Sequence, residues 1–571
     1  MARANDEAAA LIQELADLLS ITGGDAFKIR AYEKAARAIA GYPEDVSGLN
    51  LTGLKKIPAV GEAIAKKLVD YNETGTIRQV EELRAQVPSS VRALTAIPTL
   101  GPKKALLLYQ RLGVATVDEL EAALDEGRLH GLKGFGPKSE ENIRHGIELL
   151  RQTGDRVLIG TAAALADEIV AALAPLAERI THAGSLRRMR ETIGDVDVLA
   201  ASADPRPLME AFTALPFVTE VIAGGDKKTS VRTYRGPQVD LRVVPPESWG
   251  AALQYFTGSQ AHNIRTREIA VKAKLKLSEY GLFTASGELI VSETEEEVYE
   301  RLGMPWIPPA LREDGGEIEA ALADALPDLV TVEHIKGDLH THTDLTDGRA
   351  TLEEMVRTAA ERGLAYYAVT DHAPDLAMHQ MTDAKMLAQR ERIRALQKEY
   401  PDLAILHGSE LNIGPDGSVD WDADFLSGFD MCVASVHSHF NQDQAEMTRR
   451  FITACENPHV HVIGHPTARL IGRRAPVDAD WDEVFRAAAR TGTAMEVNCF
   501  PDRLDLPADL IRRALRFGVK FSIDTDAHSV ADQRNIRFGV GTAQRGWLTP
   551  DDVINTWPLP RLREFLAAKK G

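Results

Sequence analysis

The strongest constraint on the fold comes from a repeated pattern in the C-terminal part of the chain. Twelve of the 16 histidines follow residue 330. Several of them, together with Glu410 and Asp526, stand close behind short apolar runs such as LAYYAV, MCVAS and KFSI, and helix-like stretches separate most of these runs. Short apolar runs of this composition predict strands. Alternating strands and helices with polar residues at the strand ends are typical of a β/α barrel with its site at the carboxyl ends of the strands.

The side chains at these predicted strand ends are imidazoles and carboxylates, the ligand mixture that binds Zn²⁺, Mn²⁺ or iron. A lone histidine is more often a structural residue, but a whole series at successive strand ends is not explained in that way. The candidate metal ligands are His340, His342, Asp347, His372, Glu410, His437, His465, Asp526 and His528. The candidates for supporting or structural positions are Asp371, His407, His439, His459 and His461.

The order of these motifs, HxH and then D, H, E, H, H and DxH, resembles the polymerase-and-histidinol-phosphatase (PHP) domain over about residues 335–571. The resemblance implies that the residues at these positions bind up to three metal ions, expected to be Mn²⁺ or Zn²⁺, and hydrolyse phosphoesters. Every ligand position is filled, which argues against a site that has lost its activity. The implied activity is that of a 3′–5′ exonuclease or a 3′-end phosphoesterase.

A separate group of acidic residues lies in the middle of the chain. Asp195 and Asp197 are two apart in DVDVLA, whose alternating valines predict a strand, so both carboxylates leave the same face. Asp240 lies in a second predicted strand, QVDLRVV, and can reach the same point from a neighbouring position in a sheet. Three carboxylates around one point repel each other unless cations lie between them. Two-metal phosphoryl transfer uses this arrangement.

These motifs resemble the nucleotidyltransferase core of family X DNA polymerases, the polymerase beta group. The match runs in order through GSLRR, GDVDVL, VDLRVV and YFTGSQAHNIRTRE. It implies that Asp195, Asp197 and Asp240 hold two Mg²⁺ or Mn²⁺ ions, with Asp240 as the base or its orienter. It also implies a nucleotide-binding set consisting of Gly184, Ser185, Arg188, Gly194, Tyr255, Phe256, Gly258, Asn263 and Arg267.

The chain departs from that family pattern at several positions. Met189 and Arg190 stand where the family has two small residues, and Ile193 stands where a phosphate-binding serine is expected. Gln238 replaces a basic residue that orients the third carboxylate, so we expect a changed metal affinity or a changed preference between Mg²⁺ and Mn²⁺. The segment GGDKKTSVRTYR, residues 224–235, predicts a basic hairpin that contacts DNA.

Residues 1–150 predict helices interrupted by related hairpins, IPAVGEAIAKKL, IPTLGPKKALLLY and LKGFGPKSEENI. In each hairpin a glycine precedes a basic helix start, and the amides at a helix N-terminus bind phosphate. The repeat resembles the helix-hairpin-helix motif, although Ala59 and Thr99 replace the first glycine in two copies. The candidate DNA-binding residues are Gly61, Lys67, Gly101, Lys103, Gly134, Gly136 and Lys138.

The start of the chain also resembles the N-terminal domain of polymerase beta, through FKIRAYEKAARAIAGYP and YNETGTIRQVEEL. Lys67 matches a lysine that forms a Schiff base and removes a deoxyribose phosphate, with Lys28, Tyr32 and Lys34 in supporting places. Such a nucleophile needs a lowered pKa, which the sequence does not reveal. Lys67 is explained equally well as a phosphate contact.

Composition narrows the class of protein and its compartment. Hydrophobic residues make up 44% and charged residues 26% of the chain, which is typical of a folded soluble protein. The net charge of −18 decides little about a nucleic-acid partner, because phosphate binding depends on local patches. No apolar run approaches the roughly 20 residues of a membrane span. Three scattered cysteines suit a reduced cytoplasm. We expect a cytoplasmic monomer, associated with the nucleoid when bound to DNA, with no membrane partner.

Together the motifs predict a chain of several domains: a polymerase beta-like helical domain (1–85), a helix-hairpin-helix region (86–152), an α+β palm and fingers of nucleotidyltransferase type (153–315), a linker (316–334) and a distorted β/α barrel (335–571). The expected function is the filling of short gaps in DNA repair, with gapped or nicked DNA and deoxynucleoside triphosphates as substrates and the PHP centre cleaning 3′ ends. The alternatives are a PHP nuclease with a weakened polymerase and a DNA-end scaffold in which both centres are idle.

Overall fold

The computed structural model describes residues 2–22, 24–40, 42, 46–57, 59–84, 91, 94–95, 97, 100–132, 134–153, 156–225, 227–376 and 381–569. Several positions in the predicted motifs and domain boundaries lie outside these ranges. They include Thr99, the expected domain boundary after residue 85, and residues 154–155 at the expected start of the catalytic domain. The chain divides into compact units that are described one at a time: Met1–Gly154 with Leu470–Ala475, and Asp155–Arg469 with Pro476–Gly571.

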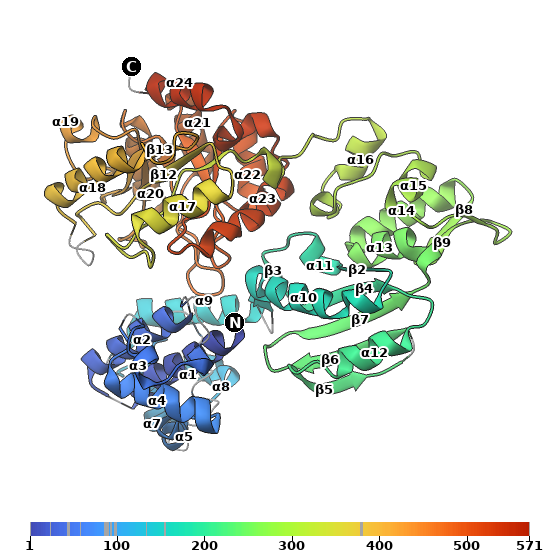
Figure 1. Ribbon diagram of the computed structural model, residues 1–571, viewed down its shortest axis with the longest axis horizontal. Coiled ribbons are helices and arrows are strands. Elements are labelled where there is room, and N and C mark those ends of the chain that lie inside the picture. Colours follow the sequence, from blue (N-terminus) through green and yellow to red (C-terminus); the bar gives the residue numbers. More distant parts are fainter. Residues whose placement is uncertain are drawn as a thin grey trace. The chain divides into compact units, whose positions relative to one another are not determined.

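Helices form the N-terminal unit, drawn from blue to cyan in Figure 1. They are α1 (Ala2–Ile21), α2 (Ala26–Ala40), α3 (Leu51–Leu54), α4 (Glu62–Thr74), α5 (Arg78–Arg84), α7 (Pro102–Leu112), α8 (Val117–Asp125) and α9 (Pro137–Thr153), with a 3-10 turn η1 (Val46–Gly48). One hydrophobic core lies among α1 to α5 and another among α7 to α9. In α1, Ile12, Leu15 and Leu18 are three residues apart and fully buried, so the helical spacing of apolar residues fills the first core.

The other unit begins with a sheet that we call the palm. Its strands lie in the order β2 (Arg179–His182), β4 (Asp195–Ala201), β7 (Gln238–Val244), β6 (Lys228–Thr233) and β5 (Val218–Ala223). Strands β4 and β7 are parallel, and the register sets Asp197 opposite Asp240. The palm also contains β1 (Val157–Leu158), α10 (Ile159–Leu173), η2 (Ala174–Leu176), α11 (Gly184–Arg187), β3 (Thr192–Ile193), α12 (Arg206–Thr213) and η3 (Pro246–Ser248). The parallel pair at the centre of the sheet therefore brings two of the expected catalytic acids side by side.

A smaller subdomain, which we call the C-subdomain, covers residues 249–322. Its elements are α13 (Trp249–Thr257), α14 (Gln260–Lys272), β8 (Leu275–Ser278), β9 (Gly281–Thr284), β10 (Leu289–Val291), α15 (Glu295–Arg301), η4 (Pro309–Leu311) and α16 (Glu317–Leu322). Its core buries Arg312, which pairs with Glu295 at 2.6 Å, and Glu295 also pairs with Arg187 of the palm at 2.8 Å. A buried charge persists only when it is compensated in this way, so the paired groups join the C-subdomain to the palm.

The C-terminal domain, which we call the barrel, is a parallel sheet with its strands in sequence order: β11 (Gly337–Asp338), β12 (Tyr366–Val369), β13 (Ala404–Asn412), β14 (Met431–Ser435), β15 (Val462–Ile463), β16 (Ala494–Asn498) and β17 (Phe521–Asp524). A parallel bridge between Thr341 and Ala527 joins the segments that follow the first and last strands, so the sheet nearly closes. The helices around these strands are drawn in yellow to red in Figure 1. They are α17 (Leu352–Glu361), α18 (Asp383–Leu396), α19 (Ala423–Leu426), α20 (Gln444–Glu456), α21 (Trp481–Thr491), α22 (Ala508–Leu515), α23 (Ile536–Arg545) and α24 (Leu559–Lys569).

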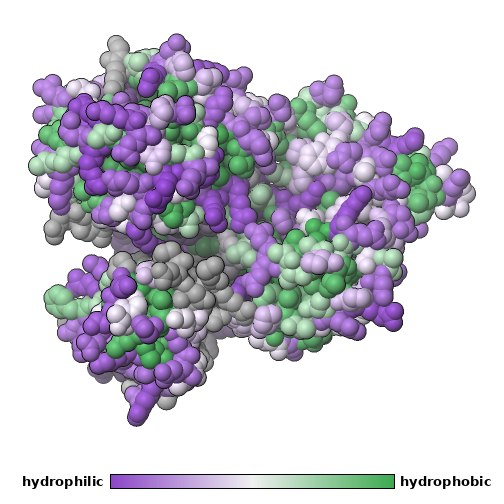
Figure 2. All heavy atoms as spheres, in the orientation of Figure 1, coloured by the Kyte–Doolittle hydropathy of each residue, from purple (hydrophilic) through white to green (hydrophobic). Residues whose placement is uncertain are grey.

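The expected fold class is confirmed in its parts: a helical N-terminal region, an α+β palm with its C-subdomain, and a distorted β/α barrel. The strand β12 is buried at every position, the pattern of a parallel strand that is covered on both faces. Hydrophilic residues cover much of the visible surface (Figure 2), whereas the apolar runs noted in the sequence supply the strands inside the barrel.

One stretch is more apolar than we expected. The segment Ile159–Leu176, which covers α10 and η2, is long and apolar enough to cross a membrane by length and composition alone. The expectation that no apolar run approaches a membrane span is therefore wrong for this stretch. Ala162, Leu165 and Ile169 of α10 are buried in the palm. A core helix of a folded domain meets the same criteria, so packing in the palm explains this composition.

Candidate active sites

The candidate ligands of the barrel lie at strand ends and in one nearby turn. His340 and His342 follow β11, His372 follows β12, Glu410 lies in β13, His437 follows β14, His465 follows β15, and Asp526 and His528 follow β17. Asp347 lies in the turn before α17. Because the strands are parallel, their carboxyl ends share one mouth of the barrel, and the predicted ligands meet there.

Their donor atoms gather into overlapping groups. Within each group, one ligand atom of every residue lies within 4.8 Å of the others. The groups are His342, Asp347, His372 and His528; His340, His342 and Asp526; and His372, Glu410 and His437. His465 joins them through Glu410, because His465 Nε2 lies 2.9 Å from Glu410 Oε1. All the predicted barrel ligands are thus brought into one connected cluster.

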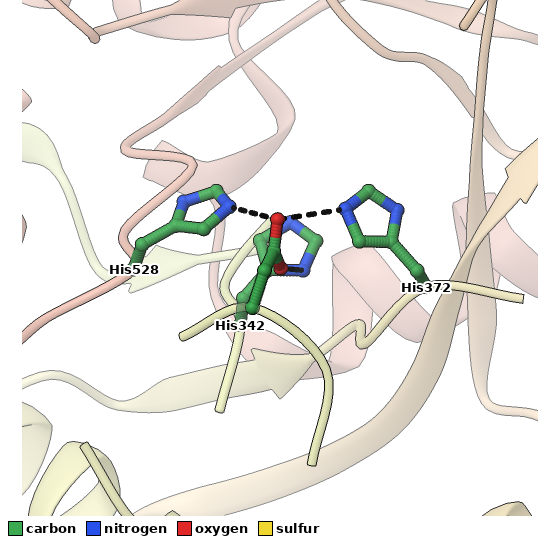
Figure 3. Close-up of side chains that lie close together, drawn as sticks. His342, His372 and His528 are labelled. Carbon is green, nitrogen blue, oxygen red and sulfur yellow. Dashed lines mark ion pairs between the residues drawn. The ribbon is translucent and has the colours of Figure 1, made fainter. Parts of the chain in front are cut away.

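Figure 3 shows His342, His372 and His528 at the barrel mouth. Asp347 Oδ2 lies 3.4 Å from Nε2 of His372 and 3.2 Å from Nε2 of His528, which approach it from opposite sides. His342 stacks on His528 with 4.4 Å between the ring centroids. Imidazoles packed this closely repel each other when all are protonated. The arrangement favours a cation bound by neutral rings over a cluster of imidazolium ions.

Charge compensation is strong around Glu410. Burial alone would raise the pKa of this carboxyl, but the charges of the surrounding imidazoles, led by His437, hold it well below its usual range. Burial opposes protonation of His372, yet Glu410 and Asp347 raise its pKa to about 10. Burial lowers the pKa of His465 to about 3. The buried carboxylates therefore need positive charge close by, which protonated imidazoles or metal ions supply.

This donor set fits divalent metal ions. The Nδ1 atoms of His342 and His465 are buried and have no hydrogen-bond partner among the described residues. Buried polar atoms without a protein partner call for water or a ligand. His465 and Asp526 also hold left-handed backbone conformations, with φ of 26° and 51°, a strain that clusters at functional sites. Imidazole and carboxylate together suit Zn²⁺ or Mn²⁺.

Sequence reasoning missed two residues of β16. Glu496 Oε1 lies 2.6 Å from His340 Nδ1, and the other carboxylate oxygen of Glu496 accepts a hydrogen bond from the backbone amide of His465. Asn498 donates to Asp526 Oδ2 at 3.0 Å. Glu496 and Asn498 are two apart on a strand, so they leave the same face. The segment AMEVN has these two polar residues at alternate positions. It contains no histidine, so the sequence did not identify it as part of the metal site.

The supporting candidates have different surroundings. Asp371 accepts hydrogen bonds from the backbone amide of Thr343, at 2.9 Å, and from the Thr343 hydroxyl, at 2.7 Å, so it fixes the chain next to His342. The ring of His407 packs on a phenylalanine with 4.9 Å between centroids, and His461 Nδ1 accepts from a backbone amide of β14. His439 is exposed, and His459 precedes β15. Among these candidates, Asp371 has the contacts of a residue that positions the site.

The palm brings its predicted carboxylates together. Asp195 and Asp197 leave the same face of β4, and Asp240 lies opposite Asp197 on β7. One oxygen of each carboxylate lies within 4.8 Å of the others. Burial, followed by the charges of Asp195 and Asp240, raises the pKa of Asp197 to about 7. Bound cations relieve repulsion of this kind, so the site fits divalent metals with oxygen ligands.

Gly184 allows the expected nucleotide-binding turn to approach these acids. Its φ is +58°, and a Cβ atom at this position would lie 2.2 Å from Asp197 Oδ2. Glycine is the residue that meets both conditions. The short helix α11 begins here and carries Ser185, and Arg188 caps its end. The start of this turn therefore lies against Asp197, and Ser185 and Arg188 follow Gly184 in the chain.

Lys228 supplies a charge that the sequence pattern did not assign. Its Nζ lies 2.5 Å from Asp240 Oδ2, while Gln238 donates to Asp240 Oδ1 at 2.9 Å. Burial raises the pKa of Asp240, but the hydrogen bonds from Lys228, Gln238 and Ser230 outweigh burial and lower it. Within the segment 224–235, Lys228 points toward Asp240, an expected catalytic acid, and the expected DNA contact of this segment stays a prediction. Lys228 on β6 therefore supplies the positive charge that a basic residue at position 238 of β7 would supply in the family.

The guanidinium of Arg188 reaches the C-subdomain. Its Nη1 donates to the carbonyl oxygen of Thr257 at 2.6 Å, and a Cβ atom at Gly258 would lie 3.2 Å from the same nitrogen. Gly258 ends α13, two residues after Phe256. On α14, Asn263 donates to the Tyr255 carbonyl at 2.7 Å. The structure thus links Arg188, Gly258, Tyr255 and Asn263 through a chain of contacts.

The aromatic pair at the end of α13 is covered by arginines. The guanidinium carbon of Arg267 lies 4.8 Å from the ring centroid of Tyr255, and that of Arg242 lies 4.4 Å from the ring centroid of Phe256. Cations over ring faces hold both in place. Arg267 thereby has a defined position on α14, with its charge beside Tyr255.

Two residues of the palm have surroundings that the family pattern does not indicate. Ile193 is fully buried in β3 and pairs with Val157 of β1. An apolar core residue thus occupies the place of the expected phosphate-binding serine. The nearest atom to a Cβ at Gly194 is Arg156 Nη1, at 3.0 Å. The role of Gly194 in phosphate binding stays a prediction.

Glycines begin the helices of the N-terminal hairpins. Gly61 caps α4 and Gly101 caps α7 without a side-chain hydrogen bond, and Gly136 precedes α9. Amides at such helix starts are donors for phosphate oxygens. Ala59 has φ of 61°, close to the left-handed region that Gly134 occupies with φ of 94°. Alanine in the first hairpin therefore adopts the kind of turn for which glycine was expected.

The lysines expected to contact DNA differ in exposure. Lys103 and Lys138 are exposed in the first turns of α7 and α9, whereas Lys67 is half-buried in α4. On α2, Lys28 and Lys34 are exposed and Tyr32 is buried in the core. Exposure of this kind suits Lys103 and Lys138 for phosphate contact.

Family models match several parts of the chain. A helix-hairpin-helix domain matches residues 3–77, a SAM-like helix-hairpin-helix tandem residues 91–148, the DNA polymerase beta thumb residues 252–313, and the PHP domain residues 338–499. The thumb match falls on the C-subdomain and the PHP match on the barrel.

Whole proteins align in the same way. The DNA polymerase/3′-5′ exonuclease PolX of Bacillus subtilis (strain 168) is 36% identical over 562 residues, which cover 97% of this chain and 98% of that protein. DNA polymerase lambda of Rattus norvegicus is 26% identical over 328 residues, 51% of this chain and 53% of that protein. A protein named probable phosphatase from Thermoanaerobacter sp. (strain X514) is 28% identical over 253 residues, 41% of this chain and 95% of that protein. The chain therefore belongs to the family X DNA polymerases that carry helix-hairpin-helix domains, a polymerase beta-type thumb and a C-terminal PHP domain.

Proposed function

We infer that this chain is a DNA polymerase that also hydrolyses DNA from the 3′ end, and that both activities depend on divalent metal ions. The observation that carries the inference is the presence of separate donor clusters in one chain, carboxylates in the palm and imidazoles with carboxylates in the barrel. The palm cluster suits the formation of a phosphodiester bond, and the barrel cluster suits its hydrolysis. The near full-length relationship to the B. subtilis polymerase and exonuclease supports the same pair of activities.

In the polymerase reaction, the 3′-hydroxyl of a primer attacks the α-phosphorus of a deoxynucleoside triphosphate, and pyrophosphate leaves. Asp195, Asp197 and Asp240 would hold two Mg²⁺ or Mn²⁺ ions, which when bound neutralise phosphate charge and make the hydroxyl more acidic. Asp240 would accept or orient the hydroxyl proton. Gln238 and Lys228 hold its two oxygens and so fix the direction in which it points.

We assign the triphosphate to the turn formed by Gly184, Ser185 and Arg188. Gly194, which follows this turn in the sequence, belongs to the same proposed binding set. A guanidinium and backbone amides are donors that match phosphate oxygens. The contacts that link Arg188 to α14 support placement of the sugar and the nascent base pair next to this turn. The residues assigned to them are Tyr255, Phe256, Gly258, Asn263 and Arg267.

In the barrel, the predicted ligands would hold up to three Mn²⁺ or Zn²⁺ ions, which when bound make a water molecule more acidic and neutralise the phosphate. Water attacks the terminal phosphodiester, the last nucleotide leaves, and a 3′-hydroxyl remains that the palm can extend. Glu496 orients His340, and Asn498 orients Asp526. Contacts of this kind fix the direction and basicity of a ligand.

Gapped or nicked DNA is the proposed substrate, and gap filling in DNA repair the proposed role. The N-terminal unit would bind the DNA through its hairpins, with Gly61, Lys67, Gly101, Lys103, Gly134, Gly136 and Lys138 as contacts. A deoxyribose phosphate lyase activity of Lys67 is part of the proposal. The matched ranges 3–77, 91–148, 252–313 and 338–499 support a division into domains at 1–85, 86–152, 153–315, 316–334 and 335–571. A cytoplasmic monomer that joins the nucleoid with its DNA completes the proposal.

Primer extension and 3′-end degradation on one gapped DNA test the pair of activities. Asp195→Ala is expected to abolish extension and spare degradation, and His342→Ala is expected to do the reverse. A loss of roughly 4 kcal/mol of charge stabilisation corresponds to about a thousandfold in rate. Asp204→Ala, at an exposed acid of the palm, and His334→Ala, ahead of β11, are the matched controls. Degradation that survives His342→Ala contradicts the barrel assignment, and extension that survives Asp195→Ala contradicts the palm assignment.

The same assays separate the alternative functions. A nuclease with a weakened polymerase degrades 3′ ends at a normal rate but extends primers poorly with either Mg²⁺ or Mn²⁺. A scaffold binds gapped DNA and does neither. The departure at Gln238, which would favour a weakened polymerase, is balanced by the ion pair of Lys228 with Asp240.

A further inference from the structure

The turn after α11 departs from the family pattern, and in this part of the chain the palm meets the barrel. Met189 has φ of 54° and packs on α23, where a Cβ atom at Gly541 would lie 2.6 Å from Met189 Cγ. Gly541 therefore leaves the space that Met189 fills. Glu191, two residues further on, pairs with Arg469 of the barrel at 2.6 Å. Met189, which replaces a small residue of the family, and Glu191 thus form a contact between the palm and the barrel.

Arg545, in the last turn of α23, reaches the same turn. Its Nη1 donates to the carbonyl oxygen of Arg188 at 3.1 Å and to Glu313 Oε1 at 2.9 Å. Glu313 Oε1 also accepts a hydrogen bond from Arg188 Nε at 3.0 Å. Arg190 of the palm lies farther from this oxygen, with its Nη1 at 3.8 Å. One carboxylate oxygen of the C-subdomain is therefore shared closely between Arg188 of the palm and Arg545 of the barrel.

These three side chains are shielded from water. The exposed fractions are 14% for Arg188, 15% for Arg545 and 26% for Glu313. Burial raises the pKa of Glu313, but the guanidinium groups of Arg188 and Arg545 outweigh burial and lower it, so the carboxylate is ionised. Solvent and salt screen such a group only weakly. Removal of one partner therefore changes how strongly the remaining two attract each other.

We propose that Arg545 is a positioning residue of the polymerase centre, supplied by the PHP barrel. The proposal rests on the assignment of Arg188 to the triphosphate in the proposed function. Without Arg545, Glu313 would attract Arg188 more strongly and oppose its attraction for phosphate, because Arg190 is more distant from the shared oxygen. Arg545 draws on the same oxygen and also fixes the Arg188 backbone through its carbonyl, which leaves the Arg188 side chain freer to bind the nucleotide. The barrel thus takes part in nucleotide binding as well as in 3′-end hydrolysis.

Steady-state kinetics of single-nucleotide insertion into gapped DNA by the full-length chain tests the proposal. Arg545→Ala is expected to raise KM for the nucleotide about tenfold, as for the loss of one hydrogen bond between charged groups. The change in kcat is expected to be smaller, and 3′-end degradation to stay unchanged. Adding Glu313→Gln to Arg545→Ala is expected to lower KM again, because Arg188 is then released from the carboxylate. A merely structural role predicts a double variant that is worse than Arg545→Ala.

Arg537→Ala is the matched control. Arg537 lies on the same helix and forms an exposed ion pair with Asp167 of the palm at 2.9 Å, a contact that contributes little, so KM is expected to stay the same. Arg545→Lys keeps the charge and is expected to restore most of the nucleotide affinity. If Arg545→Ala fails to fold, Arg545→Lys takes its place, and KM is then compared between Arg545→Lys with and without Glu313→Gln.

Arg188→Ala keeps the two inferences apart. If KM is unchanged in Arg188→Ala, the triphosphate assignment of the proposed function fails. If Arg188→Ala raises KM but Arg545→Ala does not, or if Glu313→Gln brings no recovery, the positioning role of Arg545 is overturned while the polymerase assignment stands.

Discussion

The palm centre and the barrel centre both gather carboxylates, but they balance the negative charge in different ways. In the palm, Asp195 is exposed, Asp240 pairs with Lys228, and the pKa of Asp197 is raised to about 7 by burial and by its acidic neighbours. In the barrel, Glu410 is buried among imidazoles and its pKa lies well below the usual range. In the protein without metal, the palm carboxylates still repel one another. In the barrel, the surrounding imidazoles largely compensate the negative charge of the carboxylates.

This difference indicates how each centre acquires its metals. Oxygen ligands at a partly exposed site suit Mg²⁺, which keeps several waters and commonly binds together with substrate phosphates. Buried imidazoles with carboxylates suit a transition metal that stays with the protein between turnovers. We therefore expect exchangeable ions in the palm and resident ions in the barrel.

Removal of metal should give the largest effect. After EDTA treatment and gel filtration, extension is expected to return within the mixing time when Mg²⁺ is added, whereas degradation stays lost until Mn²⁺ or Zn²⁺ is restored. Elemental analysis before treatment is expected to find a transition metal that His342→Ala lacks and Asp195→Ala retains. Equal loss of this metal from both variants would remove the distinction between the centres.

Glu496→Gln tests whether the barrel cluster depends on its supporting carboxylate. Loss of the charge beside His340 is expected to weaken metal affinity about 10- to 100-fold, the range for residues that orient a ligand. A titration of degradation against Mn²⁺ measures this change, with extension as the internal reference. Glu483→Gln, at an exposed glutamate of α21, is the control. An unchanged Mn²⁺ titration would show that Glu496 does not support the ligands.

The pH dependence of metal binding should distinguish the centres further. The raised pKa of Asp197, about 7, means that this carboxyl is protonated below pH 7 in the metal-free protein. Metal must displace that proton, so palm affinity is expected to fall up to about tenfold per pH unit below 7 and to level off above it. In the barrel, the pKa values of His372 and His528 are raised to about 10 and about 9, so affinity is expected to keep rising above pH 7. Calorimetry on His342→Ala measures metal binding by the palm, and calorimetry on Asp195→Ala measures metal binding by the barrel. Identical pH profiles of metal affinity would contradict the difference between the two centres.

Lys228→Ala should have the smallest effect. Its side chain is 39% exposed, and pairs of this kind contribute about 1 kcal/mol or less, so extension is expected to slow at most about fivefold. Gln238→Arg in the Lys228→Ala background returns a positive charge from β7 and is expected to recover the rate. Absence of recovery would mean that the position of the charge, and not its presence, is what Asp240 requires.

Much of the fold follows from local patterns. Apolar runs that end in ligand-type residues predicted the barrel, and DVDVLA with QVDLRVV predicted the strands that carry the acids, because the alternation of side chains along a strand is a local property. The roles assigned to the site residues remain predictions, but their convergence in space is what the patterns implied. Helix starts at Gly61 and Gly101 were equally visible, since glycine and the basic turn after it are adjacent in the sequence.

The residues that sequence reasoning missed depend on long-range geometry. Lys228 reaches Asp240 because β6 lies next to β7, and nothing in GGDKKTSVRTYR fixes that order. Glu496 meets His340 across 156 positions of sequence, and Arg545 meets Arg188 across 357. The order of strands in a sheet and the contacts between domains determine which residues form such pairs. Neither produces a periodic pattern in the sequence. The departure at Met189 was visible, but its packing partner in α23 was not.

The parallel bridge between Thr341 and Ala527 has a consequence during synthesis of the chain. The ribosome releases His340 and His342 long before Asp526 and His528, and the barrel can close only after the last of these has emerged. The palm acids, by contrast, are complete before the barrel has begun. A translation product that stops early therefore carries the palm acids without the complete set of barrel ligands and without Arg545.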